Sequence, residues 1–216
     1  MNIRKAIIIS LLAVPSISMA QSEWELPDAQ KDKIEKANIK SSKPKKALDP
    51  KYTVGTVPVV DGKVEWTYTV KADGKNAEEV FNTAFNLLSD MTKEEIQTDK
   101  SRITAVNKAE HIIAAHFEEE LVFSSALLAR DFTEFRYTLI ATAKEGELEL
   151  KLCRISYDYE KKRPTAQVYP AEELITDENA MNKKRTKFYP MTGKFRCKTI
   201  DRKDAIFSNF EQEFSK

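Results

Sequence analysis

The sequence predicts an α+β fold of two layers, with an antiparallel sheet in one layer and two main helices in the other. Apolar and polar residues alternate in several runs between residues 57 and 157, which is the period of strands with one buried face. Apolar residues recur at helical spacing between residues 77 and 91, and again between residues 206 and 214. The expected order is therefore β-β-α-β-β-β-β-α, with both helices on one face of the sheet.

The first element is expected to be a β-hairpin that turns at Asp61-Gly62. The turn that matches the twist of the strands needs positive φ at both central residues, and Asp-Gly favours it. Pro58 lacks a backbone donor, which places the first strand at an edge. The apolar residues of the two strands are Val57, Val59 and Val60 before the turn, and Val64, Trp66, Tyr68 and Val70 after it.

An amphipathic helix is expected next. Asn76 can accept from the first helical amides while Glu79 reaches back to it, which is a capping-box pattern. The apolar stripe of this helix consists of Ala77, Val80, Phe81, Ala84, Phe85, Leu88 and Met91.

Four further strands are expected at residues 103–106, 112–117, 135–143 and 148–157. The third is the clearest, and Glu145-Gly146 turns it into the fourth. Residues 121–131 are apolar enough for another strand or for a packed loop, and the sequence does not decide between them.

The pattern loosens between residues 160 and 198, where a short helix is expected at 171–181. The final helix is expected to open near Ile200-Asp201, with Ile206, Phe207, Phe210 and Phe214 on its apolar side. Residues 160–198 either cover the second face of the sheet or leave it open. If the face is open, it offers a groove in which Trp66, Tyr68, Phe135 and Tyr137 are the candidate lining residues; if these residues face the helices, they belong to the core.

The sequence resembles a known family at this point. The run from Thr56-Val57-Pro58-Val59-Val60-Asp61-Gly62-Lys63-Val64, the capped helix with Phe81 and Leu88, the strands and the late Ile200-Asp201 carry the resemblance. The family consists of exported proteins of Gram-negative gut bacteria, known as a domain of unknown function with a fold like that of TATA-binding protein. The resemblance covers residues 55–158, with a looser match through the tail. It implies a curved sheet with helices on one side and a periplasmic or surface location, and it supplies no catalytic residue.

The N-terminal residues have the three parts of a secretory signal peptide. Arg4 and Lys5 precede a short apolar stretch, and Ser18-Met19-Ala20 ends in small residues, so cleavage is expected between Ala20 and Gln21. Gln21 stands where a lipoprotein needs cysteine. The expected division is a signal peptide at 1–20, a Lys-rich tether at 21–50 and one α+β domain at 51–216, with its core at 55–158 and its tail with the C-terminal helix at 159–216.

Charge and hydropathy limit the partners. The chain carries 35 Lys and Arg against 34 Asp and Glu, and loss of the two leader cations leaves a net charge of −1. Neutral balance and export argue against a nucleic-acid partner. No stretch after the leader approaches the ~20 apolar residues of a membrane span, so no transmembrane segment is expected.

The residue types that carry chemistry form no recognisable motif. Cys153 and Cys197 are either joined as a disulfide, which export permits, or buried and reduced. His111 and His116 are expected on opposite faces of one strand, where they cannot bind a metal together. Glu118-Glu119-Glu120 is expected in a solvated turn. Ser124 and Ser125 lack the flanking glycines of a nucleophile elbow, so no catalytic, metal or cofactor site is predicted.

The sequence favours a non-enzymatic exported module that binds an envelope ligand or protein through the open face of its sheet or an edge strand. One alternative is a hydrolase whose carboxylates converge only in the fold. The other is an envelope structural or assembly protein that pairs through the edge of the first hairpin. The ligand, the partner and the oligomeric state are left open.

Overall fold

The computed structural model describes residues 48–126, 129–159 and 166–216. The predicted signal peptide and almost all of the predicted tether lie outside these residues. The described elements, in chain order, are η1 (Pro50–Tyr52), β1 (Val59–Val60), β2 (Lys63–Val64), β3 (Trp66–Lys71), α2 (Ala77–Met91), β4 (Arg102–Asn107), β5 (Ile112–Ala126), β6 (Ala129–Lys144), β7 (Glu147–Tyr159), β8 (Gln167–Pro170), α3 (Ala171–Leu174), α4 (Asp177–Ala180) and α5 (Pro190–Phe214).

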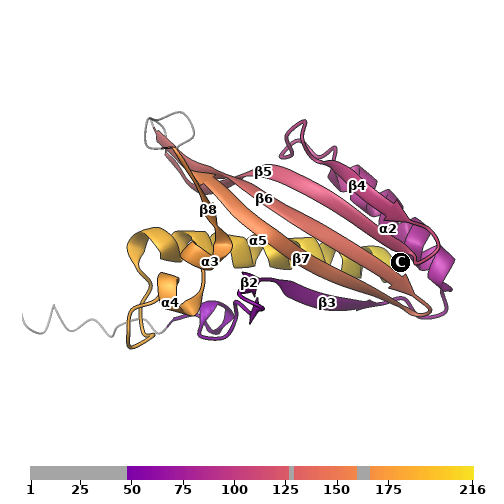
Figure 1. The fold of residues 1–216 in the computed structure, drawn as a ribbon, viewed down its shortest axis with the longest axis horizontal. Coiled ribbons are helices and arrows are strands. Elements are labelled where there is room, and N and C mark those ends of the chain that lie inside the picture. The colour runs from indigo at the N-terminus through magenta and orange to yellow at the C-terminus, as the bar shows by residue number, and fades with distance from the viewer. Residues whose placement is uncertain (1–47, 127–128, 160–165) are drawn as a thin grey trace, which may run out of the picture. The chain divides into compact units, whose positions relative to one another are not determined.

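The main sheet has six strands, all paired antiparallel. Its order is β3-β7-β6-β5-β4 (Figure 1). The short strand β8 also pairs with β7, along the same edge as β3. β3 pairs with residues 147–152 of β7, and β8 pairs with residues 156–159. The predicted α+β class and the antiparallel sheet are confirmed.

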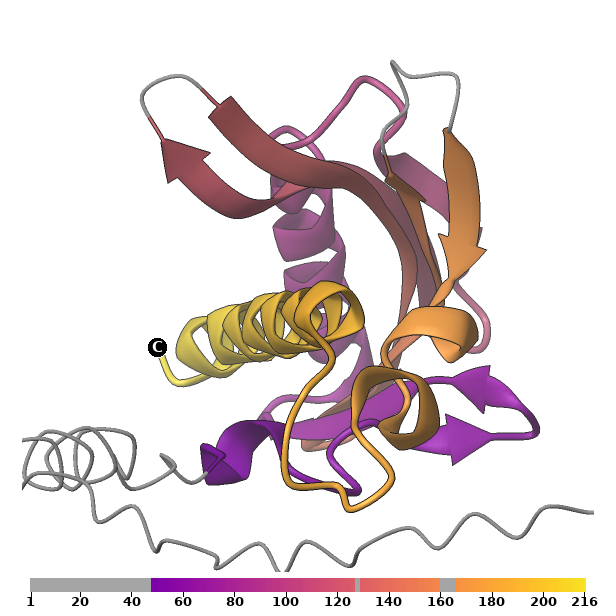
Figure 2. The same cartoon turned by 90° about the vertical axis from the view of Figure 1, so that its left-hand side faces the viewer.

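The two long helices lie on one face of the sheet, as predicted, and the sheet curves around them (Figure 2). This face holds the core, where α2 and α5 cover fully buried residues such as Leu139, Leu148 and Tyr157. The short helices α3 and α4 contact α5, and α3 also contacts β2 and β8. The 166–198 segment therefore extends the sheet edge and the helix layer, and the outer face of the sheet carries no described helix.

The four aromatic groove candidates face the helices. Trp66 is 6% exposed, Phe135 is 1% exposed and Tyr137 is fully buried, while Tyr68 stacks on Phe207 of α5. Strand alternation decides this outcome, because Thr67 and Thr69 take the opposite side of β3 and are exposed. The groove interpretation of these residues is wrong, and the core alternative describes them.

The C-terminal helix begins earlier than the sequence indicated. Pro190 opens α5 at a position where a missing amide costs nothing, ten residues before the expected start. Gly193 lies in the first turn of α5, and a larger residue does not fit there because its Cβ would stand 2.4 Å from the Cβ of Phe188. The predicted helix at 171–181 consists of two single turns, α3 and α4.

Two further expectations change in the central strands. β5 runs to Ala126, so Glu118, Glu119 and Glu120 lie in a strand and the solvated turn is wrong. The undecided residues 121–131 belong mainly to β5 and β6, which pair as a long hairpin. His111 precedes β5 in a turn, with φ of +51°, and only His116 lies in the strand.

The first hairpin turns at Asp61 and Gly62 with φ of +50° and +76°, as predicted. Its ladder is short, however: β1 pairs with β2 in a separate two-stranded sheet, and the chain then continues as β3 beside β7. Val59 and Val60 are 50% and 46% exposed, so they do not enter the core. The hairpin projects from the rest of the fold (Figure 2).

Candidate functional site

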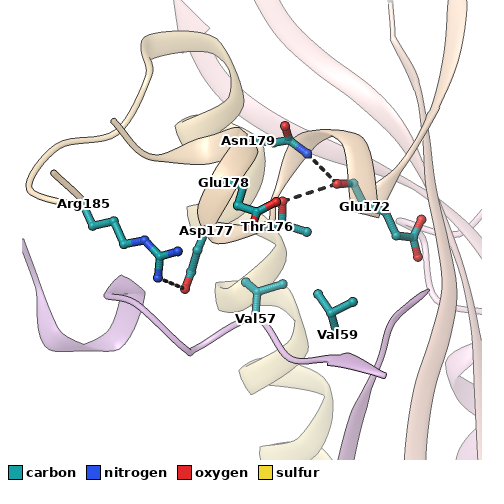
Figure 3. A pocket seen from close by; sticks show the side chains of 8 residues that line it. All are labelled: Val57, Val59, Glu172, Thr176, Asp177, Glu178, Asn179 and Arg185. Atoms are coloured by element: carbon teal, nitrogen blue, oxygen red, sulfur yellow. Dashed lines mark hydrogen bonds and ion pairs between the residues drawn. The ribbon is translucent and has the colours of Figure 1, made fainter. Parts of the chain in front are cut away.

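A hollow of about 460 Å³ lies between the first hairpin and the short helices α3 and α4 (Figure 3). One wall is apolar and the other polar. The lining residues are Val57, Val59, Glu172, Thr176, Asp177, Glu178, Asn179 and Arg185.

The apolar wall is formed by two valines at the start of the first hairpin. Val59 belongs to β1 and Val57 lies two residues before it, and both side chains point toward the short helices (Figure 3). The sequence placed both valines in the core. Val57 is 5% exposed and packs in the core, while Val59 is half exposed at the hollow.

The polar wall is fixed by bonds to the N-terminal segment. Glu172 Oε1 accepts a hydrogen bond from Val64 N at 2.7 Å, and Asp177 Oδ2 accepts one from Gly55 N at 2.9 Å. Arg185 Nη1 lies 3.7 Å from the same Asp177 oxygen. These contacts occupy one oxygen of each carboxylate and hold the two sides of the hollow together.

Arg196 of α5 secures this wall from inside the fold. Its side chain is fully buried and donates to the carbonyl oxygens of Tyr52, Thr53 and Ile175. Its Nη2 also lies 2.7 Å from Asp177 Oδ1, an ion pair whose atoms are out of line for a hydrogen bond. A buried guanidinium with this many partners makes the hollow a preformed feature.

Two polar side chains stand exposed at the mouth of the hollow. Asn179 Nδ2 donates to the Glu172 carbonyl at 2.7 Å. Glu178 makes no hydrogen bond or ion pair with the described residues. The free carboxylate of Glu178 is therefore available to a ligand.

Comparison with known proteins identifies the family. A crystal structure of a DUF4468 family protein from Bacteroides ovatus ATCC 8483 matches with a TM-score of 0.73 and 34% sequence identity, over 79% of this chain and 97% of that chain. The family model described as "domain of unknown function with TBP-like fold" matches residues 66–158. The chain belongs to the DUF4468 family.

A second solved structure supports the fold of this DUF4468 protein. A TBP-like protein from Parabacteroides distasonis ATCC 8503 matches with a TM-score of 0.61 and 18% identity, over 74% of this chain and 97% of that chain. No curated protein matches the chain. The family resemblance seen in the sequence is confirmed, and export stays a prediction.

The hollow lies outside the family match and was not predicted as a site. Six of its eight lining residues come from residues 172–185, where the sequence pattern is loose. The only available signal was the exposed edge of the first hairpin, which Pro58 indicated.

Two other clusters of charge in this DUF4468 protein are buried in the sheet. Glu119, 1% exposed, receives Arg202 Nε at 2.6 Å and Nη2 at 2.9 Å. Glu118, 3% exposed, faces the other side and pairs with Arg136 and Lys100, each at 2.7 Å. Burial alone would raise the pKa of Glu118, but the hydrogen bonds from Lys100 and Arg136 outweigh it and lower the pKa.

These buried clusters favour a structural role. A general acid needs a raised pKa, and the lowered pKa of Glu118 is the opposite. Among the residues that the structure describes, no group of three or more His, Cys, Asp or Glu side chains could hold a metal ion. Likewise, no described helix is long and apolar enough to cross a membrane.

The two cysteines are free thiols in the structure. Cys153 follows the inward-facing Leu152 in β7, so strand alternation points it to the outer face, whereas Cys197 belongs to α5 on the inner face. Burial raises the pKa of both thiols. Of the two alternatives from the sequence, the reduced one describes this arrangement, and both thiols are poor nucleophiles.

Proposed function

We propose that this protein is an exported, non-enzymatic binding module, and that its ligand occupies the hollow between the first hairpin and the α3–α4 turns. The observation that carries the proposal is a preformed cavity with one apolar wall and a free carboxylate at its mouth. The lining carboxylates support binding over catalysis, because Glu172 and Asp177 are each bonded to backbone amides of the segment they hold.

The ligand site is tested by a charge reversal at the mouth. The purified protein is equilibrated with envelope extract, washed, and the retained molecules are identified by mass spectrometry. Glu178→Arg should remove an identified ligand, since it places a long cation at the mouth of the hollow. Glu173→Arg is the matched control, because Glu173 is an exposed acid of α3 outside the lining.

Retention of the ligand by the three proteins decides whether the hollow is the binding site. An identified molecule retained by the parent protein and Glu173→Arg, and lost from Glu178→Arg, supports the site. Equal retention by all three proteins, or retention of nothing, overturns it.

Export is the second part of the proposal and has its own test. Its support is the cationic, apolar and small-residue pattern of residues 1–20. Intact-mass measurement of the protein purified from its native envelope should give a chain that begins at Gln21. A chain that begins at Met1 and stays in the cytoplasmic fraction would rule export out.

A further inference from the structure

The edge of β1 beside the hollow presents backbone groups that no other strand uses. β1 pairs only with β2 among the described residues, in the register Val59↔Val64 and Val60↔Lys63. Val64 N donates to Glu172, away from β1, and Glu65 N donates to Pro58 O at 3.4 Å. Val59↔Val64 is therefore a non-hydrogen-bonded pair, and the N–H and C=O of Val59 face away from β2.

Pro58 does not weaken this edge. In the alternation of an antiparallel strand, the backbone of Pro58 faces β2, where its carbonyl accepts from Glu65. The missing N–H of proline is thus lost from the hairpin and not from the free edge. Val59 is half exposed, and no hydrogen bond that the structure shows among the described residues uses its N–H or C=O.

We infer that the ligand of the hollow is an extended peptide segment that pairs with Val59 and places a long basic side chain in the hollow. This inference rests on the proposed function and names the class of ligand. A peptide residue that exchanges two hydrogen bonds with Val59 has its side chain on the same face as that of Val59. That face is the one that Val57 and Val59 turn toward the hollow (Figure 3).

The composition of the hollow selects the side chain. Lys and Arg have apolar stems and charged ends, so the stem packs on Val57 and Val59 while the cation reaches Glu178. Arg185 already forms an ion pair with Asp177. Among the described residues that line the mouth, Glu178 is thus a carboxylate without an ion-pair partner. A peptide with an acidic or short apolar residue at this position gains no such contact.

The test uses synthetic, fluorescently labelled peptides of the form Thr-Val-Thr-Lys-Thr-Val-Thr, measured by anisotropy against the purified protein. N-methylation of the central lysine removes the donor that faces Val59, and we expect at least about tenfold weaker binding. N-methylation of the next threonine is the matched control, because its amide faces away from β1. Replacing the central lysine by glutamate should weaken binding by at least about tenfold as well.

The position of binding is read separately by amide chemical shifts of the ¹⁵N-labelled protein. The largest shifts should centre on Val59, and Glu178→Lys should weaken binding while Glu173→Lys leaves it unchanged. Equal effects of the two N-methyl groups, or shifts centred elsewhere, overturn the inference.

Failure here is distinguishable from failure of the proposed function. If no peptide binds while a Glu178-sensitive ligand of another class is identified from envelope extract, the hollow is a site and the peptide inference is wrong. If neither is found, the proposed function is wrong too.

Discussion

Glu118 and Glu119 are neighbours in β5, yet they occupy two different regions of the molecule. Glu119 lies on the inner face, where its partner Arg202 comes from α5, more than eighty residues later in the chain. Glu118 lies on the outer face, where Arg136 comes from the adjacent strand and Lys100 from the segment before β4. One carboxylate joins the two layers of the fold, and the other joins strands within one layer.

The two carboxylates are therefore expected to differ in how much stability the protein loses when one of their cations is removed. The inner pair is enclosed, since the Arg202 side chain is 20% exposed and bonds both oxygens of Glu119. The outer carboxylate has two cations that share it, so the loss of one leaves the other. Glu119 also accepts hydrogen bonds from the neutral side chains of Gln97 and Tyr137, but Arg202 is the one cation among the described residues that the structure shows bonded to it. A buried carboxylate with one cationic partner is therefore expected to be the more sensitive position.

Arg202→Leu should have the largest effect, because it leaves Glu119 buried without its cation. We expect the free energy of unfolding to fall by about 3–5 kcal/mol, measured by urea denaturation. The double variant Glu119→Leu, Arg202→Leu should recover much of this loss, because no unpaired charge remains. Glu120→Gln is the control, because the Glu120–Arg130 pair is exposed and should contribute less than about 1 kcal/mol. A loss from Arg202→Leu no larger than that of Glu120→Gln would contradict the comparison.

The outer cluster should appear in the pH dependence of stability. Glu118 has a lowered pKa in the folded protein, so the folded state favours its charged form more than the unfolded state does. Its contribution is present above the unfolded pKa, near 4.5, and is lost as pH falls through the lower folded pKa. Glu118→Gln should therefore make the unfolding free energy below pH 4.5 less dependent on pH. An unchanged slope between the parent and Glu118→Gln would show that other carboxylates dominate.

The sequence predicted the layers because period-two alternation identifies which side of a strand is buried. It placed Val64, Trp66 and Val70 on one face without knowing what covers them. The same rule applied to Glu118 and Glu119 requires one of them to face the core. Three adjacent acids suggested a solvated turn instead. The cations that pair with these acids come from other elements of the fold, so no pattern near residues 118–120 reveals the pairing.

The candidate site was beyond the sequence for a related reason. Its walls are two single helical turns, held by Arg196 against the N-terminal segment, and single turns carry too few residues for a periodic signal. The early start of α5 was also beyond the sequence, because Gly193 packs closely against Phe188 and a sequence cannot distinguish such a glycine from a helix break.

The smallest expected effect concerns Arg154, an exposed residue in the middle of β7. Its φ of +54° lies in the left-handed region although it stands within a strand, at a bulge where two residues of β7 oppose Tyr137. This conformation costs a non-glycine residue about 1–2 kcal/mol, whereas glycine adopts it freely and loses about 0.5–1 kcal/mol of chain entropy. Arg154→Gly should therefore be more stable than Arg154→Ala by about 1 kcal/mol or less in urea denaturation. Because Arg154 is exposed and β3 and β8 leave this part of β7 unpaired, neither variant should disturb the core. A glycine variant less stable than the alanine variant would mean that the positive φ at this bulge does not strain the residue.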